Sequence, residues 1–551
     1  MELLAAIRRK FQTILGDQQS QYWKVYLPVL AVNIPSSLLF FLAVYFAGHL
    51  QNDSVVTGVG IGQSTLYCLL SSSIMGFSLL FESYAGAIKS SDDPNKLGEL
   101  LVKCSLQGGM VFLALVGPFL NIVHVISYLG EEKETHDAAK LFIRVNCFWP
   151  IFTYMQDLLV KYLIIQGYFK TPMVVGLSGL AVNALLSYLC IDVFEWGVIG
   201  FGVSWTLTPI IIITGTVLFC VQHKQDMLWN GISSEIWLGW GEMMKLGAFN
   251  SCRVLSGNSL YVLANIICQV GGPTSAATVI IVDKVNLLFN FFVYSGGSAT
   301  AIILGTALGR KSHVEVKKAM VIGVINWAIE RTFSLTVMFL TAGSIATLFT
   351  DTQTVLDGVK KAEPSMAFLY LLFGLDELLA QGILTPLGGQ TLIGISATLS
   401  IFLVGYPMMF YMVYRTSTGA AGIFWCFVAS YFVQCMVYVV RMAFIKIDRE
   451  IESSSERVDR GFNHNSSVKE NKSCCIMENL STCEENKNDS HACKVANISN
   501  VPENLEVNTG DKNNLIETEE STLFCNSRVK KGAVAICSIC FIIVTTLLSF
   551  L

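Results

Sequence analysis

Long apolar runs separated by short polar breaks constrain the fold of this chain more than any other feature. A helix needs about 20 mostly apolar residues to cross a bilayer, because hydrocarbon cannot satisfy free backbone groups. Such runs lie near 26–48, 55–80, 106–128, 142–165, 173–192, 197–220, 244–271, 275–306, 318–349, 362–385, 392–414 and 419–441. A polar linker, 221–243, divides them into six and six, and a further run at 532–551 predicts a thirteenth span. We therefore expect an all-α integral membrane protein.

The composition agrees with a membrane protein and excludes several function classes. Charged residues make up 14% of the chain, whereas soluble proteins carry about 25%. The net charge of −4 argues against a nucleic-acid partner. The 16 cysteines lack the paired spacing of metal ligands and predict neither a zinc site nor a disulfide framework. No nucleophile–base pair falls at one membrane depth, so we expect neither an enzyme, nor a cofactor, nor a metal site.

The two sets of six runs repeat each other at a constant offset. The segment 85–90 matches 307–312 at its Ala, Lys and Ser positions, an offset of 222 (307 minus 85). The same offset relates three pairs of glycines: Gly167 and Gly389, Gly197 and Gly419, and Gly200 and Gly422. An even number of spans in each half makes the repeats parallel, as in some known transporters. The sequence thus predicts two parallel six-helix lobes, an N-lobe at 25–220 and a C-lobe at 244–441.

Lysine and arginine set the expected orientation, because cytoplasmic loops are rich in them. They gather in the segments that share a side with the N-terminus, for example Lys89, Lys96, Lys170, Arg310 and Lys311. We therefore expect residues 1–24 and the linker 221–243 to be cytoplasmic. Residues 442–531 form an expected cytoplasmic tail, which reads as disordered because Asn, Ser, Glu and Lys dominate it. The C-terminus would then lie outside.

Short motifs occur in the order and spacing of one transporter family: Gly48-His49-Leu50, Val160–Gly167 followed by Pro172, Val182–Leu185, Gly197–Gly200, Leu308-Gly309 and Gly388-Gly389-Gln390. Over residues 24–441 the chain resembles the multidrug and toxin extrusion (MATE) family, as a divergent member of its animal branch. The resemblance implies two lobes around a cavity that opens alternately to either side. It also implies a monomer in the plasma membrane that exports small organic ions in exchange for H⁺, with Na⁺ as the other possible coupling ion.

The chain departs from the family where animal members carry carboxylates that face the C-lobe cavity. There these acids bind protons and attract cationic substrates. In this sequence the four corresponding positions are Gly257, Val262, Lys284 and Gly374. All four acids are missing, and one has become a lysine.

Other charged residues lie close to the vacated positions. Arg253 is four residues before Gly257, and Glu377 is three residues after Gly374, so each shares a helix face with a lost acid. Asp376 adjoins Glu377, and Asp283 adjoins Lys284. Two interpretations stay open: an ion-pair network that only holds the helices together, or an altered binding site, because intramembrane charges are functional candidates by default.

The expected N-lobe keeps more of the family pattern. Asn33, two residues before a proline, replaces a family glutamine, and Asn183 matches a family asparagine. Glu82 corresponds to an acidic position of the family, and Tyr261 in the C-lobe keeps an aromatic position where a ring could stack on a flat cation. The resemblance makes all four candidate substrate-binding or ion-binding residues.

The remaining intramembrane charges have structural explanations. Asp157 and Lys161 are four residues apart, so they can pair on one helix face, and Lys161 can also extend toward the nearby membrane surface. Glu330 and Arg331 are adjacent. Because neighbouring residues on a helix do not face each other, we expect their partners on other helices.

These observations predict a secondary active antiporter that exports organic ions and xenobiotics by alternating access. A lipid or amphipath flippase of the same superfamily is one alternative, and a receptor or scaffold that has lost transport is another. If Glu377 and Asp283 neutralise Arg253 and Lys284, the cavity is nearly neutral. We then expect weak binding of permanent organic cations and tolerance of anionic or zwitterionic substrates.

Overall fold

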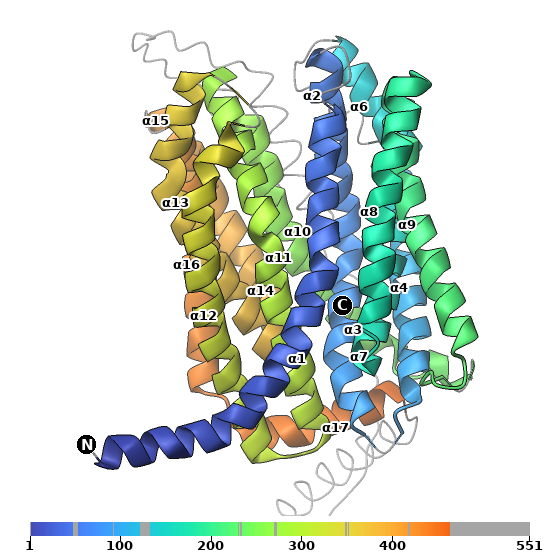
Figure 1. Ribbon diagram of the computed structural model, residues 1–551, viewed down its shortest axis with the longest axis vertical. Helices are drawn as coiled ribbons and strands as arrows, with labels where there is room; N and C mark the ends of the chain where they lie inside the picture. The colour runs from blue at the N-terminus through green and yellow to red at the C-terminus, as the bar shows by residue number, and fades with distance from the viewer. Residues whose placement is uncertain are drawn as a thin grey trace, which may run out of the picture. The chain divides into compact units, whose positions relative to one another are not determined.

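A computed structural model describes residues 2–47, 53–91, 93–121, 133–229, 231, 234–268, 273–347, 350, 352–416 and 419–462, all within one compact unit. These residues form helices joined by short turns (Figure 1). The first half of the chain contains α1 (Glu2–Ala47), α2 (Asp53–Thr65), the π-helical η1 (Leu66–Ser71), α3 (Ser72–Lys89), α4 (Lys96–Leu120), α6 (Lys133–Asn146), α7 (Trp149–Gln166), α8 (Lys170–Tyr188), the π-helical η3 (Leu189–Val193) and α9 (Gly197–Gln222).

A short 3-10 turn, η4 (Ser234–Trp237), precedes the second half. That half contains α10 (Trp240–Ile267), α11 (Pro273–Gly309), α12 (His313–Ala346), α13 (Gln353–Glu377), the π-helical η6 (Leu378–Leu384), α14 (Gln390–Ser400), the π-helical η7 (Ile401–Gly405), α15 (Tyr406–Arg415) and α16 (Gly419–Ala443). A last helix, α17 (Ile447–Phe462), follows α16.

The expectation of an all-α membrane protein is confirmed. Among the residues that the structure describes, eight helical stretches are long and apolar enough to cross a bilayer: Gly58–Lys89, Lys96–Leu120, Lys170–Val193, Gly197–Gln222, Thr274–Gly309, Gln353–Leu384, Gln390–Arg415 and Gly419–Ala443. The expected runs near 26–48, 244–271 and 318–349 are also helical in their described parts, within α1, α10 and α12. Twelve spans stay a prediction, and the thirteenth run, 532–551, lies outside the described residues.

The internal repeat is visible in the backbone. Gly197 and Gly419, which are 222 residues apart (419 minus 197), have φ of +54° and +59° and stand at the start of α9 and of α16. Only glycine adopts such angles without strain. Gly167 and Gly389 agree less well, because Gly167 has φ +98° whereas in the second half the positive φ falls on Gly388.

The first helix of each half packs against the other half. In the first half, α1 contacts α11 and α8; in the second, α10 contacts α3 and α14. Because the offset of 222 carries α3 onto α11 and α8 onto α14, these two sets of contacts are equivalent. The contacts of α1 with the second half include a reciprocal pair of amide hydrogen bonds between Gln19 and Asn326 of α12 (2.5 and 3.2 Å).

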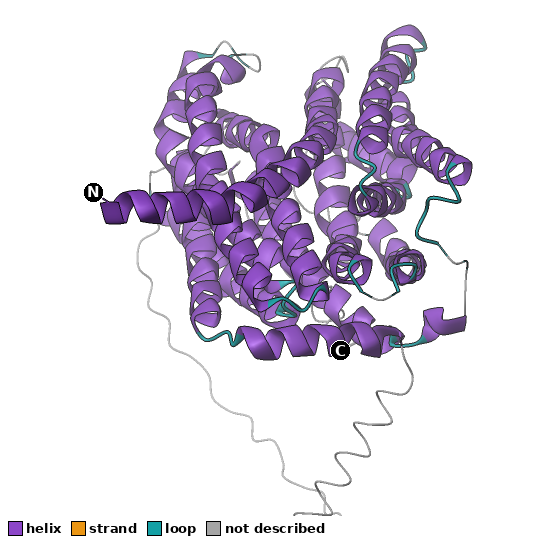
Figure 2. Cartoon of the chain, turned by 60° about the horizontal axis from the view of Figure 1, so that its bottom comes forward, coloured by secondary structure: helices purple, strands orange, loops and turns teal. Residues whose placement is uncertain are grey.

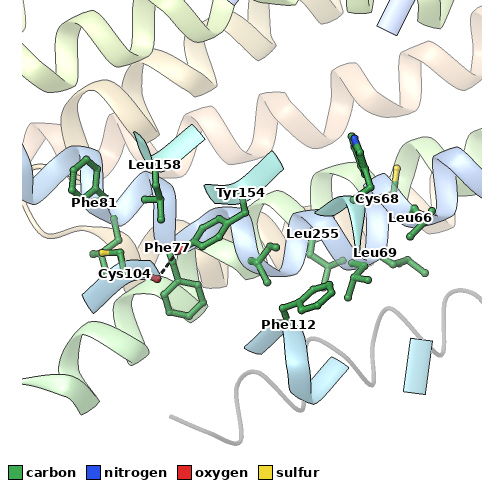
Figure 3. Close-up of a cluster of buried hydrophobic side chains, with 14 of the residues drawn as sticks. Leu66, Cys68, Leu69, Phe77, Phe81, Cys104, Phe112, Tyr154, Leu158 and Leu255 are labelled. Carbon is green, nitrogen blue, oxygen red and sulfur yellow. Dashed lines mark hydrogen bonds between the residues drawn. The ribbon is translucent and has the colours of Figure 1, made fainter. Parts of the chain in front are cut away.

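Glycine permits the close approach of the two halves along α3. A Cβ on Gly76 would lie 2.1 Å from the backbone nitrogen of Ser251 on α10, and a Cβ on Gly86 would lie 3.2 Å from the Cα of Gly305 on α11. Figure 3 shows Leu255 of α10 among first-half side chains, near Tyr154, whose hydroxyl donates to the carbonyl of Cys104 (2.6 Å). The two halves therefore share part of one apolar core.

The run predicted at 142–165 is wrong as a single helix. Residues up to Asn146 belong to α6, and α7 begins at Trp149. Pro150 stands in the first turn of α7, where its missing N–H and fixed φ suit the start of a helix rather than its interior. Because the sequence stays apolar across this break, hydropathy alone does not reveal that two helices meet there.

Residues 447–462, at the start of the segment 442–531 predicted to be disordered, form α17, so that prediction is wrong for this part. Figures 1 and 2 show α17 lying across one end of the bundle, called the α17 end below. The helix contacts α3 of the first half and α10, α11 and α12 of the second. Ile451 is buried in the apolar cluster that includes Leu387 and Tyr438. Arg457 donates to the carbonyls of Leu387 (2.9 Å) and Pro386 (3.4 Å).

Ion pairs fix the start of α17. Arg441 on α16 pairs with Glu450 (2.8 Å), and His313 on α12 contacts Asp448. The remainder of the predicted tail, 463–531, lies outside the described residues.

We predict that α17 contributes to stability and that the chain beyond it does not. Truncation after residue 446 should lower the thermal stability of the purified protein, because burial of Ile451 alone contributes about 1.5–3 kcal/mol. Truncation after residue 462 serves as the control and should melt like the full chain. Equal melting temperatures for the two truncated proteins would contradict the packing role of α17.

Candidate functional site

A buried charged triad joins α10 to the end of α13. Arg253 Nη2 donates to Asp376 Oδ2 (2.9 Å) and to Glu377 Oε2 (2.6 Å). The three residues are 8%, 1% and 5% exposed. Glu377 is the last residue of α13 before the π-helical η6. Consecutive carboxylates thus converge on one guanidinium nitrogen.

The triad keeps unused hydrogen-bonding capacity and an excess charge. Asp376 Oδ1 and Arg253 Nε have no hydrogen-bond partner among the described residues. Two carboxylates against one guanidinium give a formal charge of −1. Buried charge is expensive unless it is paired and fully hydrogen-bonded, so this arrangement can accept a further donor or positive charge.

Asp283 and Lys284 form a separate pair on α11, with 3.5 Å between Lys284 Nζ and Asp283 Oδ2. Their side chains are 18% and 26% exposed. The expected neutralisation of both cations is therefore present, Lys284 by Asp283 and Arg253 by Glu377. Asp376 is an additional carboxylate, which makes the net formal charge of these five residues −1.

The expectation that Glu330 and Arg331 find partners on other helices is wrong for Glu330. Arg331 Nη2 donates to both carboxylate oxygens of its neighbour Glu330 (2.8 and 2.9 Å). The Arg331 side chain is long enough to fold back around the helix, which a rule based on Cβ directions does not anticipate. Its guanidinium also lies over the ring of Tyr370 on α13, 4.6 Å from the centroid, in a cation–π contact.

Arg331 explains why one family acid cannot simply stand at Gly374. A Cβ on Gly374 would lie 2.8 Å from Cζ of Arg331, so the guanidinium fills the space of a side chain there. At Gly257 a Cβ would meet only the Tyr431 hydroxyl, at 3.4 Å. Sequence reasoning missed the proximity of Arg331 to Gly374, since only the packing of α12 on α13 brings them together.

A second charged cluster lies on α3 and α7 in the first half. Lys161 Nζ is 3.1 Å from Asp157 Oδ2, which confirms the predicted pair, and 3.3 Å from Glu82 Oε2. It also donates to Ser78 Oγ (3.0 Å), and that hydroxyl in turn bonds to Asp157. Lys161 is 15% exposed and points into this cluster, so the expectation that it extends to the membrane surface is wrong.

The cluster borders a cavity of about 30 Å³ between the two halves. Asn33 on α1 lines it and donates to Ser295 of α11 (2.9 Å). Of the sequence candidates, Glu82 and Asn33 thus meet at one place.

Asn183 and Tyr261 lie elsewhere. Asn183 donates to Thr208 Oγ1 (2.8 Å) and to the carbonyl of Ser204 (3.2 Å), both on α9. Tyr261 packs against Phe427 of α16, with ring centroids 4.5 Å apart. These contacts join helices within one half and give both residues a packing role in this conformation.

The side chains of these two clusters are carboxylates, a guanidinium and an ammonium group. No group of three or more His, Cys, Asp or Glu side chains in the described part of the chain could hold a metal ion. Paired carboxylates, guanidinium and ammonium groups at membrane depth can bind ions or protons and can change partners when helices move.

Comparison with known proteins identifies relatives of this chain. A profile of the MatE family matches residues 28–189 and 252–411, and the second match ends 222 residues (411 minus 189) after the first. Protein DETOXIFICATION 33 of Arabidopsis thaliana is 21% identical over 461 residues, covering 81% of this chain and 92% of the relative. Multidrug and toxin extrusion protein 1 of Homo sapiens is 22% identical over 420 residues, covering 72% and 69%.

The fold also matches a solved structure. The crystal structure of the eukaryotic MATE transporter AtDTX14 superposes with a TM-score of 0.74 at 16% identity, covering 80% of this chain and 99% of that one. The names of these relatives denote transporters rather than enzymes.

We predict that the Glu330–Arg331 pair holds the helices together. Glu330→Gln should lower the free energy of unfolding by about 3–5 kcal/mol, because Arg331 is left buried without its carboxylate. Replacing both residues by Leu and Met should cost much less, because no charge then remains buried. Thermal unfolding of the purified protein measures both effects, with Glu315→Gln, a partly exposed residue of the same helix, as control. A double variant as unstable as Glu330→Gln would refute this explanation.

Proposed function

The chain belongs to the MatE family, and from that premise we propose that it is an H⁺-coupled antiporter that exports organic ions by alternating access. Its two halves act as the lobes that move. The transporter works as a monomer in the plasma membrane, with its N-terminus in the cytoplasm. The Arg253–Asp376–Glu377 triad carries this proposal, because it places exchangeable charge where the second half would face a central cavity.

The contacts between the lobes suit a rocking motion. Besides the bonds that α1 makes to α11 and α12, the hydrogen bonds between the halves include Asn258 to Ser72 Oγ (2.7 Å) and Gln381 to the carbonyl of Leu79 (3.4 Å). Elsewhere glycines and small side chains meet along α3. Small side chains at such surfaces let packed helices shift past one another, as a rigid-body motion of the halves requires.

The triad supports a specific charge preference. Arg253 occupies the place that an organic cation would take beside two carboxylates, so it acts as a built-in competitor. The interaction energy of two unit charges 4 Å apart is about 4 kcal/mol at an effective dielectric constant of 20. We therefore propose that permanent organic cations bind weakly and that anionic or zwitterionic substrates are tolerated, because Arg253 can turn toward an anionic group.

Liposomes that contain the purified protein test the transport proposal. With an imposed pH gradient, we expect an organic anion or zwitterion dye to cross the liposome membrane in the direction opposite to proton flow. A quaternary ammonium dye should move more slowly. Collapse of the gradient should stop net movement. Transfer of a labelled lipid between leaflets without dye movement would instead favour a flippase, and no movement of any probe would favour a receptor or scaffold.

Removal of the built-in cation should reverse the preference. Arg253→Met combined with Asp376→Asn keeps the triad at a charge of −1 and leaves Glu377 free to pair with a ligand. We predict that a quaternary ammonium dye binds at least about tenfold more tightly, equivalent to about 1.4 kcal/mol. Equilibrium binding in detergent measures this change without any need for transport.

Lys245→Met is the matched control, because Lys245 is an exposed lysine on the same helix. This control should leave dye binding unchanged. Unchanged or weaker binding in the double variant would show that Arg253 does not compete with cations.

A further inference from the structure

The cavity between the halves is lined by residues of both. The first half contributes Asn33, Glu82, Asp157 and Lys161, and the second half contributes Ser298 and Ile302 of α11. The cavity lies about two helical turns from the ends of α3 and α7 at the α17 end. Charges of one half are thus covered by an uncharged surface of the other, which would be withdrawn if the halves parted here.

Glu82 is the carboxylate with free capacity in this cavity. It is 1% exposed, and its Oε1 has no hydrogen-bond partner among the described residues. Asp157 differs, because it bonds to Ser78 and its side chain is 31% exposed. The charged groups that face Glu82 are Lys161 and Asp157, both on α7, while α1 and α11 present the uncharged Asn33 and Ser298. Two carboxylates and one ammonium leave the cluster at −1.

The size and charge of the cavity select its ligand. A water molecule needs roughly 10–15 Å³ of such space, so about 30 Å³ holds at most a few waters and excludes an organic ion. A metal cation bound at Glu82 would lie beside the Lys161 ammonium, which is 3.3 Å from Oε2 and repels it. A proton on Oε1 neutralises the cluster without a second cation.

We propose that Glu82 is a proton-binding site whose occupancy is tied to closure of the two halves at the α17 end. With the halves in contact, Glu82 is buried and a net charge there is unfavourable, so a proton from water binds to Oε1 and the cluster becomes neutral. When the halves part, water solvates the carboxylate and the proton returns to water. Lys161 stays paired with Asp157 throughout.

This inference rests on the proposed function, since it needs halves that move. It adds a site in the first half, distinct from the Arg253 triad in the second, and it assigns the proton to Glu82. Glu82 binds a proton more tightly when the halves are in contact at the α17 end than when they have parted. Protonation therefore favours the closed α17 end by this difference in binding free energy.

A distance measurement tests the proposal without any substrate. Spin labels on unnatural amino acids replace Lys170 at the start of α8 and Val314 at the start of α12, both exposed. The full chain is studied in lipid nanodiscs between pH 8 and pH 5. We expect two distance populations, with the shorter one increasing as the pH falls.

Variants of Glu82 assign the effect. In Glu82→Gln the cluster is neutral at every pH, so the short distance should dominate throughout. In Glu82→Asp the pH dependence should persist with a shifted midpoint, which also guards against a folding defect in the glutamine variant. Glu315→Gln, which changes a partly exposed carboxylate of α12, is the control and should behave like the wild type.

Infrared difference spectra between the two pH values supply a second readout. The protonated carboxyl band should be present in the wild type and lost in Glu82→Gln. Two populations that ignore pH, or a pH response that survives in Glu82→Gln, would overturn the proton site while leaving alternating access intact. A single population at all pH values in every variant would overturn both proposals.

Discussion

Charge inside a bilayer must be compensated, and the structure is organised around how this chain meets that requirement. A charged side chain at the membrane centre costs at least about 2.5–3.5 kcal/mol on insertion scales. In the described part of the chain, three largely buried groups compensate this cost by ion pairing: Glu330 with Arg331, Arg253 with Asp376 and Glu377, and Lys161 with Glu82 and Asp157. The first group is balanced, whereas each of the other two holds one carboxylate too many. Balance suits a permanent support, and an odd charge suits a site that gains and loses a ligand.

Sequence reasoning recovered what depends on local spacing. The apolar runs marked the helices, the four-residue interval placed Lys161 beside Asp157, and the offset of 222 matched Gly197 with Gly419. It could not place Lys161 beside Glu82 or Arg331 beside Gly374, because such contacts depend on how one helix is rotated and docked against another. The positions of Arg253 and Glu377 on the expected faces suggested proximity, but only the structure showed that Asp376 joins them.

The misjudged tail has a different cause. Composition alone marked 442–531 as disordered, since charged and polar residues dominate it. Within it, Ile447 and Ile451 are four residues apart and lie on one face of α17, which is the pattern of an amphipathic helix. An average composition over 442–531 does not show this short amphipathic pattern. A break at α6 and α7 was missed for the opposite reason, because the apolar character continues through it.

The exchange of first helices between the halves makes the chain comparable to a fused homodimer. In such an isologous arrangement each contact occurs twice, as in a two-fold dimer. The charged groups ignore this symmetry: the counterpart of Glu82 is Leu304, that of Lys161 is Ile383, and that of Arg253 is Ala31. Fusion of two copies into one chain permits such divergence, since identical subunits would carry every charge in duplicate. One motion of the two symmetric halves can therefore depend on two chemically different charged groups, one in each half.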